Sequence, residues 1–362
     1  MARPSGRPPG GTRRMANGNG NNGGNNGGNN GGGTGGGNGA GGRRPRIGLA
    51  LGGGVARGWA HIGVLRALKR YGIEADIVCG SSVGALVGGV HLAGKLDILE
   101  DWARTLTRLK IVGYLDLRLR QSGGLISGDR LLAELRLHLG DVRIEELPCP
   151  YAAVTTDLVT GHEVWLQRGE LVDAMRASFS LPGVFPPVSI DGRWMIDGAL
   201  VNPVPVSACR ALGAQMVIAV NLAGDILGKA RKPGASVPTA AGFDLLRLVE
   251  DEAPDQRPPS GISALARRIF RRDYEGPSLF GVMVSSLGIV TDRITRSRLA
   301  GDPPDVHIAP RLGHIGLTEF DRAADCIREG EAAVERVLPD LHDALSVFAT
   351  GPRESTRAPL RD

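Results

Sequence analysis

The sequence predicts an α/β fold in which helices cover both faces of a mainly parallel central sheet. The first observation behind this prediction is a strand–helix–strand–helix opening over Ile47–Ala93. Parallel strands are joined by crossover helices that lie on the faces of the sheet, so this order implies a sheet covered on both sides. The second observation is that the α/β order continues along the chain, with no sign of a second independent core.

The opening elements are predicted from their apolar pattern and their ends. The first helix places Ile62, Leu65 and Leu68 on one face, and Gly72 follows it as a terminating residue. The strands are short apolar runs that end at glycines. The two strands and two helices are predicted, in chain order, at Ile47–Leu51, Trp59–Tyr71, Ile77–Cys79 and Gly84–Ala93.

The later elements keep the same α/β order. Strands are predicted at Tyr151–Thr155, Glu163–Leu166, Trp194–Ile196, Met216–Val220 and Val306–Ile308. Helices are predicted at Asp129–Leu139, Leu171–Ser178, Val204–Leu212, Leu279–Ala300 and Glu319–Leu338.

We expect three regions along the chain. Residues 1–44 are predicted to be a disordered tail, because Gly, Asn and Arg dominate them and nothing there can bury a core. Residues 45–340 are predicted to form one folded domain, and residues 341–362 a C-terminal tail. Within the domain, residues 229–276 are rich in proline and charge and are predicted to be an insertion.

The net charge of +5 belongs to the tail and not to the folded body. Seven arginines precede Ile47, so the 43 Lys and Arg residues fall to 36 in the rest of the chain, against 38 Asp and Glu residues. A nucleic-acid-binding protein carries its basic surface on the fold. We therefore expect no nucleic-acid partner.

Cysteine usage and hydropathy indicate where the chain works. Its four cysteines lie far apart without a CxxC pair, which favours reduced thiols in the cytoplasm over disulfides or a zinc site. No run of about 18 apolar residues is present, and the N-terminus lacks the apolar core of a signal peptide. We expect a cytoplasmic protein, with peripheral contact at the inner face of the membrane left open.

One segment of the insertion, Ile262–Arg272, has the pattern of a basic amphipathic helix. Apolar residues recur at helical spacing on one side, at Ile262, Leu265, Ala266, Ile269 and Phe270. The other side carries Arg267, Arg268, Arg271 and Arg272. Such a helix can lie on an anionic membrane surface or can pack over the site as a cap, and both interpretations stay open.

The first chemical motif is Gly80-Ser81-Ser82-Val83-Gly84, between a predicted strand and a predicted helix. Its two glycines allow the sharp, strained turn that lifts a nucleophilic serine above a sheet. The helix that follows aims N–H groups and the positive end of its dipole at the reacting centre. Ser82 is therefore predicted to be a nucleophile, and the alternative is a tight strand-to-helix turn without chemistry.

The second motif is the glycine-rich run Gly52–Gly58 at the end of the first strand. Trp59 stands where a P-loop needs lysine, which excludes that class of site. A dinucleotide-binding fingerprint has its outer glycines at Gly53 and Gly58 but needs a glycine where Val55 stands, so it remains a minor alternative. The third interpretation is an oxyanion hole, in which successive backbone N–H groups converge on a developing alkoxide.

The third motif is Asp197-Gly198-Ala199, directly after a predicted strand. An aspartate followed by glycine at a strand end lies in a turn, where its carboxylate can point into a cleft. Alone, it is an ordinary turn residue, but paired with Ser82 it can act as a general base. Burial would raise its pKa above the usual value of about 4 and suit it to that role.

Four segments in this order resemble the patatin-like phospholipase family: LALGGGVARGWAHIGVLRAL, GSSVG, RASFSLPGVFPP and DGALVNPVPV. The resemblance covers about residues 47–224 and continues more weakly to about 340. It implies a three-layer patatin-like sandwich and a serine esterase that hydrolyses lipid acyl esters, of the phospholipase A or lysophospholipase type. It implies no cofactor and no metal.

Residue by residue, the resemblance implies that Ser82 is the nucleophile and Asp197 its base. It assigns the oxyanion hole to Gly52, Gly53 and Gly54. Supporting positions are Arg57, Gly80, Gly84 and Gly198, and the stretch Ala177–Pro182 lines the site. Val55 departs from the glycine of many family members, which restricts the loop at that position.

Two alternatives to the serine–aspartate dyad stay open. A Ser-His-Asp hydrolase would need a histidine after the acid, and His314 in a glycine-flanked loop is the credible candidate. The remaining candidates, which we interpret as structural, are His61, His307 and His342. The second alternative is a non-catalytic or regulatory protein that keeps the fold, because a motif does not guarantee turnover.

Overall fold

One compact unit contains all the residues that the computed structural model describes, which are 44–107, 110, 128–224 and 279–349. The predicted insertion over 229–276 and its basic helix at Ile262–Arg272 lie outside the described residues, as does the predicted tail up to Arg43. None of the helices in the described ranges combines the length and the apolar composition needed to cross a bilayer.

The centre of this unit is an eight-stranded mixed sheet with the order β5-β6-β3-β2-β1-β7-β8, and β4 is also paired with β3. The strands that pair in parallel are β1 (Ile47–Leu51), β2 (Ile77–Ser81), β3 (Tyr151–Asp157), β7 (Met216–Val220) and β8 (Val306–Ile308). The antiparallel pairs involve β4 (Glu163–Leu166), β5 (Val188–Ile190) and β6 (Arg193–Asp197). The predicted α/β class is confirmed, and β5 is a strand that the sequence pattern did not predict.

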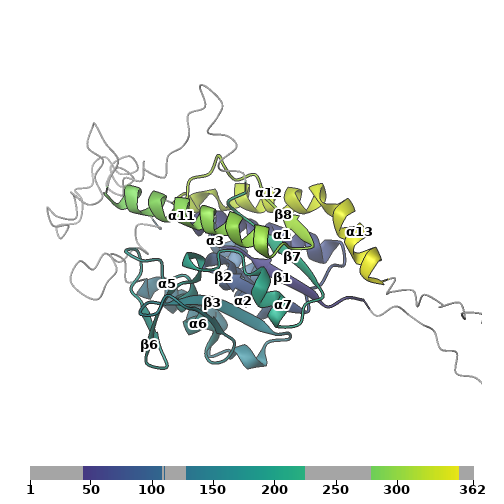
Figure 1. Cartoon of the computed structure of the whole chain (residues 1–362). Coiled ribbons are helices and arrows are strands. Elements are labelled where there is room, and N and C mark those ends of the chain that lie inside the picture. Colours follow the sequence, from purple (N-terminus) through teal and green to yellow (C-terminus); the bar gives the residue numbers. More distant parts are fainter. Residues whose placement is uncertain (1–43, 108–109, 111–127, 225–278, 350–362) are drawn as a thin grey trace, which may run out of the picture. The chain divides into compact units, whose positions relative to one another are not determined.

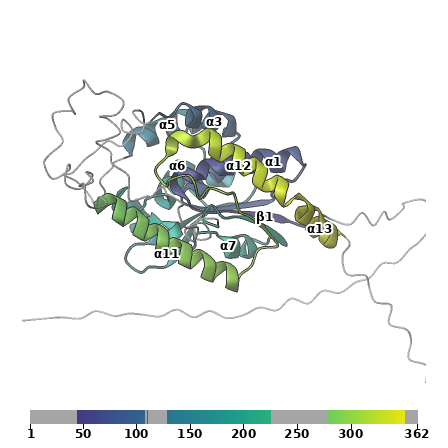
Figure 2. The same cartoon turned by 90° about the horizontal axis from the view of Figure 1, so that it is seen from above.

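Helices lie on both faces of the sheet, as Figure 1 and Figure 2 show. They are α1 (Ala60–Arg70), α2 (Val83–Leu92), α3 (Leu96–Arg104), α5 (Asp129–Leu139), α6 (Leu171–Ser178), α7 (Val206–Ala211), α11 (Leu279–Gly301), α12 (Ala323–Arg336) and α13 (Leu338–Ala349). In Figure 2, α1 and α12 lie on one side of β1, and α7 and α11 lie on the other. Side chains of β1 alternate accordingly, because Leu49 and Leu51 join the core under α1 while Ala50 joins the core under α7.

Helices α1 and α12 pack at close backbone distance through two glycines. A Cβ atom added at Gly63 would lie 1.9 Å from the carbonyl oxygen of Ile327. A Cβ atom at Gly330 would lie 2.0 Å from the carbonyl oxygen of Ala60. No real Cβ atom tolerates such distances to backbone, so this helix pair depends on both glycines.

Replacing Gly63 with alanine is expected to lower the free energy of unfolding by about 3 kcal/mol, because the two helices must move apart. Urea unfolding followed by circular dichroism measures this change. Gly301→Ala is the matched control, since an added Cβ there meets nothing within 4 Å. Equal stability of the two variants would contradict the close helix contact.

The C-terminal boundary needs a correction. A tail was predicted from residue 341, but α13 spans Leu338–Ala349 and Leu341 is fully buried in the core. Pro339 explains the difference, since it ends α12 by its missing N–H yet suits the first turn of a new helix. Helix α3 was also missed, and α12 begins at Ala323, four residues after the predicted start.

Candidate active site

Ser82 lies in a strained turn between β2 and α2, where the GSSVG motif predicts it. Its backbone angles are φ 56° and ψ −127°, a conformation that side chains rarely adopt. The glycines on either side, Gly80 and Gly84, allow the backbone of neighbouring segments to pack closely against the turn. A Cβ atom at Gly80 would lie 2.4 Å from the backbone of Ala85, and one at Gly84 would lie 2.2 Å from the carbonyl oxygen of Leu51.

The hydroxyl of Ser82 donates a hydrogen bond of 2.7 Å from Oγ to Oδ2 of Asp197. Both residues are buried, with exposed fractions of 7% and 1%. The other carboxylate oxygen, Oδ1, accepts from the backbone N–H of Ala199 at 2.8 Å. The Thr156 hydroxyl donates to the carbonyl oxygen of Asp197 at 2.8 Å. The carboxylate is thus held in one orientation that faces the serine.

The sheet register explains how these two residues meet. β4 occupies one edge of β3, so β2 and β6 share the other edge. β2 pairs along that edge up to Ser81 opposite Val154, and β6 continues it with Asp197 opposite Thr155. The two strands therefore end head to head. Ser82 follows directly after β2 and faces the last residue of β6.

Gly198 allows this junction to close. A Cβ atom at Gly198 would lie 2.1 Å from the carbonyl oxygen of Val154. The glycine begins a short 3-10 helix, η3 (Gly198–Leu200), for which Asp197 is the N-cap residue. The turn places one carboxylate oxygen of Asp197 against the N–H of Ala199 and the other against the hydroxyl of Ser82.

Burial raises the pKa of Asp197 to about 6, while the hydrogen bonds from the Ala199 N–H and the Ser82 hydroxyl act in the opposite direction. Such a carboxylate is a stronger base than an exposed one. It remains ionised at neutral pH, so it can accept the proton of Ser82.

The stretch Ala177–Pro182 supports both members of the pair. The hydroxyl of Ser178 accepts from the backbone N–H of Ser82 at 2.9 Å and donates to the carbonyl oxygen of Val154 at 2.6 Å. The carbonyl oxygen of Ser180 accepts from the backbone N–H of Asp197 at 3.0 Å. This stretch was predicted to line the site, but the role of Ser178 was not predictable, because only the folded chain brings its hydroxyl to Ser82.

The predicted oxyanion donors need a correction. The N–H of Gly52 donates to the carbonyl oxygen of Val220, and that of Gly53 to Pro203, both at 3.0 Å. These two groups are already used within the fold. In the part of the chain that the structure describes, the N–H groups of Gly54 and Val55 make no such bond. Of the three predicted donors, Gly54 therefore keeps a free N–H, and the next residue, Val55, offers a second one.

The glycine loop runs directly beside the dyad. A Cβ atom at Gly53 would lie 3.3 Å from Cβ of Ser82 and 3.1 Å from Cβ of Ala199. Val55 takes a positive φ of 51°, a conformation that glycine adopts without strain. Many family members have glycine at this position. Val55 keeps a backbone conformation that glycine adopts readily, and its positive φ makes the backbone strained.

His61 holds the loop from behind. Its Nε2–H donates to the carbonyl oxygen of Gly52 at 2.7 Å, and the ring is fully buried, with no partner for Nδ1 in the described ranges. Burial lowers the pKa of His61 to about 4, although the bond to Gly52 raises it. The ring therefore stays neutral and acts as a hydrogen-bond donor to the loop, a role that was not predicted from the sequence.

Replacing His61 with leucine is expected to lower kcat by about 10- to 100-fold with little change in KM, because the loop loses the bond that fixes its carbonyl. His61→Gln can restore an N–H donor to Gly52 and should recover most of the rate. Steady-state kinetics on a soluble ester measures both variants. Equal rates for the leucine and glutamine variants, at equal melting temperatures, would contradict this role.

Arg57 is buried and braces a neighbouring segment. Its Nε and Nη2 atoms donate to the carbonyl oxygen of Ile315 at 2.8 Å and 2.6 Å. The adjacent N–H of Ala56 donates to the carbonyl oxygen of Leu317 at 3.1 Å. Arg57 was predicted to support the site. It does so by hydrogen-bonding the segment around Ile315 to the 3-10 helix at Val55–Trp59, which follows the glycine loop.

The histidine that a Ser-His-Asp arrangement needs is not at the dyad. No histidine side chain in the described residues hydrogen-bonds Ser82 or the Asp197 carboxylate, whose donors there are the Ser82 hydroxyl and the Ala199 N–H. His314 is exposed, and its backbone oxygen accepts a bond from Arg322. The described residues also contain no cluster of His, Cys, Asp or Glu that could hold a metal ion.

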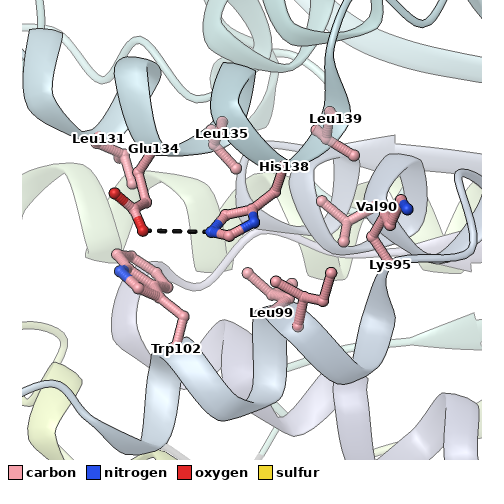
Figure 3. A pocket seen from close by; sticks show the side chains of 10 residues that line it. Val90, Lys95, Leu99, Trp102, Leu131, Glu134, Leu135, His138 and Leu139 are labelled. Atoms are coloured by element: carbon pink, nitrogen blue, oxygen red, sulfur yellow. Dashed lines mark hydrogen bonds and ion pairs between the residues drawn. The ribbon is translucent and has the colours of Figure 1, made fainter.

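Among the cavities that the described residues line, two lie away from the dyad. Figure 3 shows the smaller one, which α2, α3 and α5 line with mainly apolar side chains beside the Glu134–His138 pair. Its volume of about 30 Å³ is too small for an acyl chain. The larger one, of about 630 Å³, is lined by Arg46, Asp76 and Pro150, which precede β1, β2 and β3. The dyad lies at the opposite ends of these strands.

The comparisons with known proteins agree on one family. The family model described as Patatin-like phospholipase matches residues 49–210. The chain is 36% identical over 346 residues to an uncharacterized NTE family protein of Mycobacterium tuberculosis (strain ATCC 25618 / H37Rv), covering 84% of this chain and 95% of that protein. It is 36% identical to the neuropathy target esterase sws of Drosophila melanogaster and 33% identical to the human patatin-like phospholipase domain-containing protein 6. Each of these two matches covers 49% of this chain and 13% of the relative.

Proposed function

This chain belongs to the patatin-like phospholipase family, and on that premise we propose that it is a lipid acyl hydrolase that cleaves carboxylic esters through an acyl-enzyme on Ser82. The observation that carries the proposal is the 2.7 Å hydrogen bond from Ser82 Oγ to Asp197 Oδ2, at a strained turn between a strand and a helix. The substrate class is a phospholipid or lysophospholipid ester, as for a phospholipase A or lysophospholipase.

In the first half of the reaction, Ser82 Oγ attacks the carbonyl carbon of the ester while its proton passes to Asp197 Oδ2. The carbonyl oxygen becomes an oxyanion beside the glycine loop. The N–H groups of Gly54 and Val55 are the donors we assign to it, because those of Gly52 and Gly53 are already bonded. The tetrahedral intermediate then expels the alcohol, which takes the proton from Asp197.

In the second half, a water molecule attacks the acyl-enzyme carbonyl and gives its proton to Asp197. Collapse of the second intermediate breaks the bond to Ser82 Oγ, which recovers its proton from the aspartic acid, and the fatty acid leaves. One carboxylate can serve both halves because its pKa of about 6 lets it accept and release a proton near neutral pH.

The test of this proposal is whether the full chain hydrolyses a short-acyl nitrophenyl ester and a lysophospholipid. We expect turnover of both, and a trapped acyl group on the peptide that contains Ser82 after rapid acid quench and mass spectrometry. Ester hydrolysis without an acyl group on that peptide would mean that another residue is the nucleophile. No hydrolysis of either ester would favour the non-catalytic alternative.

The rate is expected to depend on pH through Asp197. Its carboxylate must be ionised to accept the Ser82 proton, so kcat/KM should fall about tenfold per pH unit below its pKa of about 6 and level off above it. Initial rates between pH 4.5 and 8 give this profile, with circular dichroism at each pH to exclude unfolding. A flat profile down to pH 4.5 would assign the base to another group.

A further inference from the structure

Three apolar side chains are exposed together at one tip of the sheet, which we call the apolar tip. Val159 is 81% exposed, Trp194 is 52% exposed and Leu158 is 49% exposed. The first and last belong to the turn after β3, and Trp194 lies in β6. The backbone N–H of Leu158 donates to the carbonyl oxygen of Trp194 at 2.8 Å, so the two segments are side by side. A contiguous exposed apolar group of this kind marks an interaction site more often than scattered single residues do.

The tip has a fixed shape. The carboxylate of Asp157 accepts from the backbone N–H groups of Val159 and Thr160, both at 2.9 Å, which closes the turn. Its other oxygen forms an ion pair with Arg193 at 2.6 Å. In the described part of the chain, the Asp157–Arg193 ion pair beneath the tip has no net charge, so the exposed apolar side chains stand on a hydrogen-bonded base that this pair leaves neutral.

The apolar tip lies at the same end of the sheet as the dyad. Asp197 pairs with Thr155, and two residues further along β3 Asp157 pairs with Met195. The tip begins one residue beyond that, which at about 3.3 Å per residue places it about 10 Å past the level of Asp197. Figure 1 shows the hairpin of β6 at the lower left, at the edge of the unit.

We propose that the apolar tip inserts into the surface of a lipid bilayer and thereby holds the dyad over its substrate. The inference rests on the proposed function, because a lipid ester lies in a membrane and the enzyme must reach it there. The exposed side chains of the tip can enter a soft lipid surface, and a tryptophan beside aliphatic side chains is typical of the membrane interface, where the indole ring is apolar and its N–H is polar.

The experiment measures how much of the full chain sediments with vesicles of pure phosphatidylcholine. All chains carry Ser82→Ala, so that the vesicles stay intact. The tip variant combines Val159→Ser with Trp194→Gln, and we expect its partition coefficient to fall at least tenfold because it loses most of the exposed apolar area. The matched control is Val347→Ser, which removes a 69% exposed valine from α13, a helix that packs against β8 at the other edge of the sheet. It should bind as the parent does.

Two further measurements keep this inference separate from the proposed function. The tip variant with Ser82 intact should hydrolyse a soluble nitrophenyl ester at the parental rate, which also shows that it is folded. If the parent does not hydrolyse this ester, the proposed function is wrong. Vesicle binding by the Ser82→Ala chain does not depend on catalysis, so it still tests the lipid contact. A parent that does not bind zwitterionic vesicles, or a tip variant that binds as well as the parent, would overturn the lipid assignment. Binding that needs anionic lipid would move the contact to charged residues.

Discussion

Ser82→Ala is expected to lower kcat for ester hydrolysis by at least about ten-thousand-fold, because no acyl-enzyme can form without the hydroxyl. No other hydroxyl in the described residues reaches the carboxylate of Asp197, whose hydrogen-bond donors there are the Ser82 hydroxyl and the Ala199 N–H. Substrate binding should change little, because the side chain that is removed is small. Steady-state kinetics on the soluble ester gives kcat and KM separately.

Ser81→Ala is the matched control for this variant. Ser81 is the neighbouring serine and is fully buried, but its hydroxyl has no hydrogen-bond partner among the residues that the structure describes. Removing an unpaired buried hydroxyl should leave the fold as stable as before or more stable. The Ser81 variant is expected to keep its activity. Loss of activity in both variants alike would point to damage of the turn and not to loss of a nucleophile.

Asp197→Asn is expected to lower kcat by about a thousand- to ten-thousand-fold, because the amide keeps the shape of the side chain but cannot take the Ser82 proton. The two hydrogen bonds that the carboxylate accepts fix its orientation, so the amide should occupy the same place. His314→Ala serves as the control for the Ser-His-Asp alternative, and it should retain the parental rate. Loss of activity in the His314 variant with the fold intact would restore that alternative.

The same substitution should not destabilise the fold at pH 8. Burial raises the pKa of Asp197 from the ordinary value to about 6, so between those two values the folded chain binds more protons than the unfolded chain. The free energy of unfolding therefore falls as pH rises through this window and stays lower above it. Asparagine avoids that cost, which is up to about 3 kcal/mol. A higher melting temperature at pH 8 together with a lost rate would separate catalysis from folding.

The elbow around Ser82 was predictable because its determinants are local. A short apolar strand, two glycines and an apolar helix follow one another within the sequence, and steric limits on the turn leave little choice of conformation. The glycines at Gly80 and Gly84 are needed because backbone approaches within 2.4 Å of where their Cβ atoms would lie. The order of strands and helices was predictable for the same reason, since each depends on its own apolar period.

The roles of individual backbone groups were not predictable. Gly52 and Gly53 read as oxyanion donors in the sequence, but their N–H groups are used by Val220 and Pro203, which come far later in the chain. Whether an N–H is free depends on what packs beside it, and the sequence does not contain that neighbour. His61 is a similar case, because its bond to Gly52 appears only when α1 packs behind the loop.

The sequence by itself determined the fold class, the strained turn that carries Ser82 and the identity of Asp197 as the candidate base. Only the tertiary structure decided that these two groups touch. They are 115 residues apart, and they meet because β6 takes over the edge of β3 where β2 ends. The physical reason is that steric limits and apolar periodicity depend on residues that are neighbours in the sequence. Which strand pairs with a given strand edge depends on competition among all the strands that can pair there.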